Sequence, residues 1–134
     1  MLGNLYNIER VTEVPGLTVF SVRLDPSDAV FDGHFPGRPV LPGVCSIQII
    51  KDCAERIAGR SLVLVNMIKC RFVSLIVPER QNILNVSVSL DEMDEGRRYL
   101  LKASVSNSGK LCVSVHAECC DCDAFKSGYV ETDE

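Results

Sequence analysis

Hydrophobic and polar residues alternate along most of the chain, in short runs that are typical of β-strands. Two such runs, Leu5 to Glu13 and Leu17 to Leu24, are separated by the turn signal Pro15-Gly16 and predict an opening hairpin. Four further runs after residue 60 are rich in Val, Leu and Ile and are bounded by turn residues. We predict these four strands at Ser61 to Phe72, Ile83 to Leu90, Arg98 to Ser106 and Lys110 to Cys119.

One segment follows a helical period instead. Pro42 leads into GVCSIQIIKDCAERIA, and Gly59 supplies a stop signal, which together predict a helix from Gly43 to Ala58. Apolar residues recur at helical spacing, so we expect most of the helix to be buried. These apolar positions are Ile47, Ile50, Ala54 and Ile57. The polar residues form one stripe along the axis, made of Gln48, Lys51, Asp52 and Glu55.

The order of these elements favours an α+β fold, with an antiparallel six-stranded sheet wrapped around one central helix. Alternation is clearest from Ile83 to Leu90, which indicates a sheet with one face on the core and one face wet or partnered. A length of 134 residues suits one domain with one continuous core. We expect this domain over residues 1–120, followed by a flexible acidic tail over residues 121–134, where five acids face one lysine.

Charge and targeting signals narrow the classes of function. Residues 1–120 carry thirteen acidic and thirteen basic residues, so no basic excess indicates a nucleic-acid partner. The opening MLGNLYNIER lacks the features of a signal peptide, and no apolar run approaches the ~18 residues of a membrane span. We therefore expect a cytoplasmic protein with reduced thiols and no membrane association. Four of the seven cysteines have apolar neighbours and are expected in the core, namely Cys45, Cys53, Cys70 and Cys112.

The segment between the hairpin and the helix is too irregular for a strand or a helix. Residues 25–43 contain four prolines and three glycines, and such long structured loops often carry function. Residues Gly33 to Val44 read GHFPGRPVLPGV. This stretch resembles the hallmark GHFPGxPVxPGV of the hot-dog-fold 3-hydroxyacyl-[acyl-carrier-protein] dehydratases of fatty acid synthesis, and it matches every fixed position. The order of elements resembles that family over nearly the whole chain.

The resemblance implies a hot-dog fold and a lyase that converts 3-hydroxyacyl thioesters to trans-2-enoyl thioesters on acyl carrier protein, without metal or diffusible cofactor. The reaction needs a base for the α proton, donors for the carbonyl oxygen and a proton for the departing hydroxide. By resemblance, His34 is the base, and the N–H of Gly43 binds the carbonyl oxygen at the start of the helix. The resemblance also places Phe35, Pro42 and Val44 at the substrate. It implies a homodimer with active sites at the subunit interface.

Position 48 departs from the family, which has Glu or Asp there to manage the leaving hydroxyl. Gln48 can orient a hydroxyl but cannot deliver a proton. Three explanations stay open. In the first, His34 passes the α proton to a hydroxyl held by Gln48 across the subunit interface. In the second, Asp52 or Glu55 supplies the acid. In the third, the protein hydrolyses acyl thioesters, or it only binds them and partners a complete homologue.

Two other groups of residues are candidates for a metal site and for a partner surface. The segment His116 to Cys122 contains one Cys-x-x-Cys, but a zinc site needs more ligands, and on a continued strand His116 and Cys119 point to opposite faces. We therefore expect no metal. A set of basic residues is a candidate surface for an acidic carrier protein, although ordinary solubilising charge explains it equally well. These residues are Lys69, Arg71, Arg80, Arg97 and Arg98.

Overall fold

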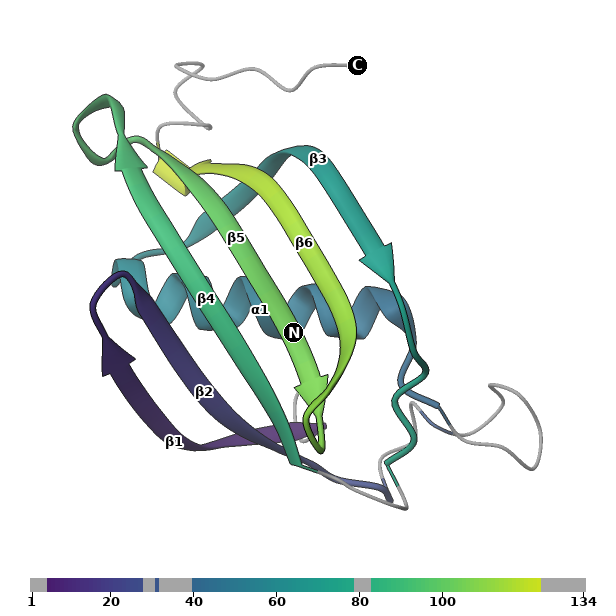
Figure 1. The fold of residues 1–134 in the computed structure, drawn as a ribbon. Coiled ribbons are helices and arrows are strands. Elements are labelled where there is room, and N and C mark those ends of the chain that lie inside the picture. The colour runs from purple at the N-terminus through teal and green to yellow at the C-terminus, as the bar shows by residue number, and fades with distance from the viewer. Residues whose placement is uncertain (1–4, 28–30, 32–39, 79–82, 124–134) are drawn as a thin grey trace.

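A computed structural model describes residues 5–27, 31, 40–78 and 83–123 of the chain. The described residues form one long helix and six strands (Figure 1). The helix, α1, spans Gly43–Ala58. The strands are β1 (Tyr6–Val14), β2 (Leu17–Leu24), β3 (Leu62–Phe72), β4 (Ile83–Met93), β5 (Arg98–Asn107) and β6 (Lys110–Asp121).

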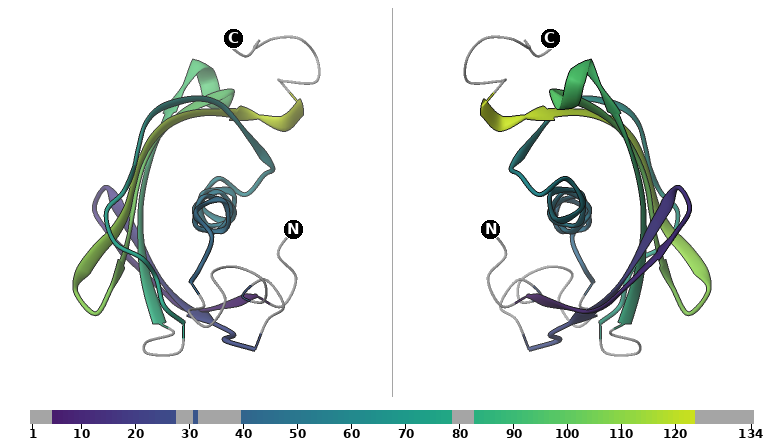
Figure 2. Two further views of the ribbon diagram at one scale, coloured as in Figure 1. Left: turned by 90° about the vertical axis from the view of Figure 1, so that its right-hand side faces the viewer. Right: turned by 90° about the vertical axis from the view of Figure 1, so that its left-hand side faces the viewer.

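The six strands form one antiparallel sheet in the order β1-β2-β4-β5-β6-β3. The predicted hairpin is confirmed: Val14 pairs with Leu17, and Gly16 takes the left-handed conformation that this turn requires, with φ 76°. The sheet curves around α1, which runs along its concave side (Figure 2). This arrangement confirms the predicted α+β architecture and leaves β1 and β3 as the two edges of the sheet.

The core lies between α1 and the concave face of the sheet. In β4 the side chains of Leu84, Val86 and Val88 are buried while Asn85 is exposed, as the alternation in the sequence predicted. The helix contributes apolar side chains at i, i+4 spacing to the same core cluster, namely Cys45, Ile49, Ile50, Cys53 and Ala54. Burial of these two complementary faces is the main driving force for the fold.

Both ends of α1 match the prediction, because residues with fixed or permissive backbones bracket it. Pro42 is the N-cap in an extended conformation, and Gly59 closes the helix in the left-handed region, with its N–H donating to the carbonyl of Glu55 at 2.8 Å. Of the four apolar positions predicted on the buried face, Ile50 and Ala54 are buried, but the prediction was wrong at Ile47, which is half-buried, and at Ile57, which is 37% exposed. The buried face follows Cys45, Ile49, Ile50, Cys53 and Ala54, so Ile47 and Ile57 lie outside it.

Most of the cysteines predicted in the core lie there. None of the seven cysteines forms a disulfide bond, and three of the four expected in the core are buried, whereas Cys70 on β3 is half-buried.

Asp121 ends β6, and its carboxylate accepts a hydrogen bond from Arg60 at 2.7 Å. Residues 124–134 lie outside the described residues, so the acidic tail stays a prediction. Within the described segments, no helix has both the length and the hydropathy to span a membrane.

Candidate functional site

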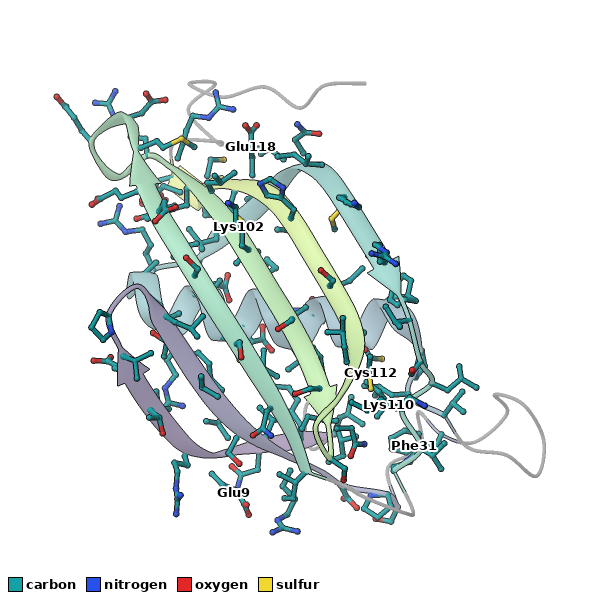
Figure 3. The ribbon with its side chains drawn as sticks, viewed as in Figure 1. Glu9, Phe31, Lys102, Lys110, Cys112 and Glu118 are labelled. Carbon is teal, nitrogen blue, oxygen red and sulfur yellow. The ribbon has the colours of Figure 1, made fainter. Side chains whose placement is uncertain are left out.

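The motif loop joins the core at both of its ends. His34 and Phe35, predicted as base and substrate contact, fall in residues 32–39, outside the described residues. Phe31, just before this stretch, and Val40, just after it, are both buried. Figure 3 shows Phe31 toward the end of the molecule where Cys112 lies, and both belong to the same core cluster. The described residues on either side of the predicted base are therefore buried in the core.

The end of the motif forms the N-terminus of α1, where the sequence predicted the carbonyl site. The carbonyl of Pro42 accepts hydrogen bonds from the N–H groups of Cys45 and Ser46, at 3.0 and 3.3 Å. Helix geometry leaves the N–H groups of Gly43 and Val44 without an acceptor inside the helix. The first turn carries no acidic side chain. These donors, which have no acceptor within the helix, and the positive end of the helix dipole suit an oxygen that gains negative charge.

The side chain of Phe72, the last residue of β3, packs against Gly43. A Cβ atom placed on Gly43 would lie 2.9 Å from Cε1 and Cζ of the Phe72 ring, closer than real Cβ contacts. The residues just before α1 are held in place as well, because the N–H of Leu41 donates to the carbonyl of Ile76 at 2.9 Å. Leu41 to Gly43 and Phe72 to Ile76 therefore lie side by side, and we call these two segments the wall of the site. The sequence pattern did not indicate this role for Phe72.

Large apolar side chains are exposed around this wall. Val44 is 74% exposed, Phe72 is 56% exposed and Leu75 is 68% exposed. Phe72 lies against Gly43 and Val44 is the next residue, so at least these two exposed side chains lie at the same end of α1, where they are candidate contacts for a ligand or a partner. The predicted contact residue Val44 thus lies at the surface, beside the N–H groups of the first helical turn.

One turn into the helix, Gln48 is held by a hydrogen-bond network. Its Nε2 donates to Oδ1 of Asp52 at 2.8 Å, the i, i+4 geometry of neighbouring helix turns. The hydroxyl of Tyr6, from β1, donates to Oδ2 of the same carboxylate. All three residues are partly buried. Burial, with a smaller contribution from the hydrogen bond to Asp52, raises the pKa of Tyr6 well above its ordinary value, so the phenol stays a donor at working pH.

The other carboxylate of the stripe has a structural partner. Glu55 Oε2 accepts a hydrogen bond from the backbone N–H of Leu62 at 2.9 Å and lies 3.3 Å from Nζ of Lys51. Glu55 thus ties α1 to the first residue of β3. The second explanation given above needs Asp52 or Glu55 as the acid. Both carboxylates already accept hydrogen bonds from other protein groups.

Most of the remaining candidates lie on β3, β5 and β6. Cys119 is buried on the concave face, whereas Glu118 projects outward and binds Arg98 at 3.2 Å (Figure 3). No three possible metal ligands gather within the part of the chain that the structure describes. Of the predicted carrier-binding residues, Lys69 and Arg71 are exposed on edge strand β3, and Arg80 lies outside the described residues.

The chain is similar to dehydratases in sequence. A family model described as ApeI dehydratase, of the ApeI-like family, matches residues 12–114. The 3-hydroxyacyl-[acyl-carrier-protein] dehydratase FabZ of Caldanaerobacter subterraneus subsp. tengcongensis is 32% identical over 84 residues, which cover 58% of this chain and 56% of that protein. The chain therefore spans little more than half the length of this curated relative.

Two solved structures show the same fold. The dehydratase heterocomplex ApeI:P from Xenorhabdus doucetiae matches with a TM-score of 0.66 at 21% identity, over 80% of this chain and 89% of that one. A variant of the fluoroacetyl-CoA-specific thioesterase FlK matches with a TM-score of 0.65 at 15% identity, over 91% of this chain and 96% of that one. These likenesses confirm the predicted hot-dog fold and, at such identities, carry no information on activity.

Proposed function

Because the chain belongs to the ApeI-like dehydratase family, we propose that it removes water from 3-hydroxyacyl thioesters to give trans-2-enoyl thioesters. The observation that carries this proposal is the family match over residues 12–114, which includes the whole motif loop and α1. The carrier we propose is acyl carrier protein, in line with the name of the FabZ relative. The pathway class is the synthesis of fatty acids or related lipids.

In this proposal the thioester carbonyl binds at the N-terminus of α1. Gly43 supplies a backbone N–H, and the Phe72 ring occupies the space that a side chain at this position would need. His34, carried over from the family motif, takes the α proton as a neutral imidazole. Phe35, Pro42 and Val44 are the proposed substrate contacts around these groups.

The proposed route for the leaving group uses His34 twice. The C2–H bond breaks, its proton goes to His34, and its electron pair forms the C2–C3 double bond as the C3–O bond breaks. His34 returns the proton to the departing oxygen, which leaves as water. Gln48 holds the 3-hydroxyl in place during this transfer. The amide at position 48 is the reason for a second candidate function: a subunit that binds acyl thioesters, or hydrolyses them, without dehydration.

We further propose that a partner subunit completes the site, with a second copy of this chain as the first candidate. Strand β3 pairs only with β6 within the described sheet, so its other edge is open to another strand. Met67, Ile68 and Phe72 on β3 are large apolar residues with exposed side chains, as expected of a covered edge. A sedimentation measurement that finds a monomer at micromolar concentration would count against a shared site.

Product analysis tests the proposed function. The protein is incubated with a 3-hydroxyacyl-[acyl-carrier-protein], and mass spectrometry then identifies the acyl group. An enoyl product supports dehydration, whereas a free acid indicates hydrolysis. Unchanged substrate indicates a non-catalytic subunit, which is then assayed again together with a complete homologue.

A further inference from the structure

We propose that Asp52 acts as a positioning residue, which turns the Gln48 amide so that its carbonyl oxygen, Oε1, faces the 3-hydroxyl of the substrate. The inference rests on the proposed function, because it assigns a direction to the hydrogen bond that Gln48 makes in that reaction. Asp52 itself does not touch the substrate. Its effect on the reaction passes through Gln48.

The pairing of donors and acceptors fixes the orientation of the Gln48 amide. A side-chain amide has one end that donates and one end that accepts, and the two ends have nearly the same shape. Nε2 of Gln48 lies 2.8 Å from Oδ1 of Asp52, where only a donor is compatible with a carboxylate oxygen. A flipped amide would bring two acceptors together at the same distance. The contact therefore selects one of two orientations, in which Oε1 has no hydrogen-bond donor among the described residues.

A second hydrogen bond holds Asp52 itself in position. Its other oxygen, Oδ2, accepts the hydroxyl of Tyr6, which lies 46 residues away on β1. Both carboxylate oxygens are thus engaged, one by the sheet and one by the helix. A carboxylate held from two elements has little freedom to turn, so Gln48 is oriented against a fixed group.

The orientation of the Gln48 amide decides which hydrogen bond the 3-hydroxyl of the substrate makes. With its amide in this orientation, Gln48 accepts a hydrogen bond from the 3-hydroxyl, as a carboxylate at this position would. The hydroxyl's own hydrogen then points at Gln48, and a lone pair on the same oxygen remains available for the proton from His34. Water leaves with both hydrogens, and His34 returns to the neutral form. An amide that presented Nε2 instead would donate to this oxygen, and the hydroxyl hydrogen would lose Gln48 as its acceptor.

A double-mutant cycle on turnover tests the proposal. Asp52→Ala removes the acceptor and is expected to lower kcat by about 10- to 100-fold with little change in KM, as is typical when a group that orients a contacting side chain is lost. In a Gln48→Ala background the same change is expected to have no further effect, because the residue through which Asp52 acts is absent. Asp52→Asn is expected to fall between, because its carbonyl can still accept from Nε2.

Glu118→Gln is the matched control, since it removes another half-buried carboxylate, which binds Arg98 at 3.2 Å on the outer face of the sheet. This variant is expected to lose stability and to keep kcat. If Asp52→Ala lowers kcat equally with and without Gln48, the positioning role is wrong while dehydration stands. If the wild-type protein forms no enoyl product, the proposed function itself fails and the inference falls with it.

A second measurement covers the case in which Gln48→Ala has no measurable turnover. The side-chain amide of Gln48 gives two NMR signals, and a fixed hydrogen bond from Nε2 separates and protects one amide hydrogen. Asp52→Ala is expected to remove this protection, and Tyr6→Phe to weaken it. A Gln48 amide that is unprotected in the wild-type protein would overturn the inference directly.

Discussion

The substitution Gln48→Glu places a carboxyl group where the family has one, in a surrounding that the structure defines. The two side chains are nearly isosteric, so the new oxygen replaces Nε2, which lies 2.8 Å from Oδ1 of Asp52. A hydrogen bond is thereby exchanged for a contact between two acids. At this distance two full charges repel each other by about 6 kcal/mol at an effective dielectric constant of 20, and screening of these partly exposed groups reduces that to a few kcal/mol.

Holding a proton on the pair removes most of this repulsion. Keeping an ordinary carboxyl group protonated at pH 7 costs about 4 kcal/mol, which is comparable with the repulsion that the proton relieves. We therefore expect the pair to share a proton over part of the neutral range. That proton is the general acid that the wild-type site lacks, and it is expected to raise dehydration, with an upper bound of about 10²- to 10⁴-fold for a positioned acid.

The same substitution is expected to make stability depend on pH. In the variant the pKa of the introduced carboxyl is higher in the folded protein than in the unfolded chain. The variant is thus as stable as the wild type below pH of about 4, and it loses stability as the pH rises through the folded value. Denaturant unfolding at pH 5 and pH 8 measures this difference, and enoyl formation at the same two pH values measures the acid.

The exchange variant Gln48→Glu with Asp52→Asn is the control. It moves the carboxylate one helical turn, and the Asn side chain can donate to position 48 and accept from Tyr6. Its stability is expected to lose the added pH dependence. If the stability of Gln48→Glu relative to the wild type is the same at pH 5 and pH 8, the expected repulsion between the two carboxylates is refuted. A fall in dehydration in a folded Gln48→Glu variant would show that the amide is required and that no missing acid limits the reaction.

Three further predictions concern the base, the carbonyl site and the buried thiols. His34→Ala is expected to lower turnover by about 10²- to 10⁴-fold with an unchanged Tm, and wild-type turnover would exclude His34 as the base. Gly43→Ala is expected to lower kcat/KM by about 10- to 100-fold, since the methyl group meets the Phe72 ring and narrows the approach to the N–H groups. Adding Phe72→Ala is expected to restore the stability lost to this contact without restoring activity. Burial raises the pKa of Cys53 and of Cys119 to about 12, so stability is expected to fall as the pH rises above 9, where the unfolded chain releases both thiol protons. A Cys53→Ala/Cys119→Ala variant with the same alkaline slope of the unfolding free energy would contradict this last cause.

Local patterns predicted the elements because burial and backbone chemistry act locally. The alternation in β4 and the Pro42 and Gly59 brackets of α1 led to nearly the observed bounds. The strand order was not predicted, because pairs such as β3 with β6 join segments about 50 residues apart in sequence. Sequence spacing cannot give such long-range contacts, which depend on how the whole sheet curves.

The same distinction holds for the site. The stripe of Gln48, Asp52 and Glu55 was evident from helical spacing, but its partners were not. Tyr6 reaches Asp52 from the first strand, and the backbone of Leu62 reaches Glu55 from β3. Spacing on a helix predicts which residues share a face, whereas the groups opposite that face are supplied by the tertiary fold.

A crystal structure of the His34→Ala variant with a bound 3-hydroxyacyl pantetheine thioester tests the proposed site most directly. Our account predicts the thioester carbonyl oxygen within ~3 Å of the Gly43 nitrogen and the 3-hydroxyl within ~3 Å of Oε1 of Gln48, with Nε2 still bound to Asp52. An acyl thioester bound away from the N-terminus of α1, with its 3-hydroxyl out of reach of Gln48, would contradict it.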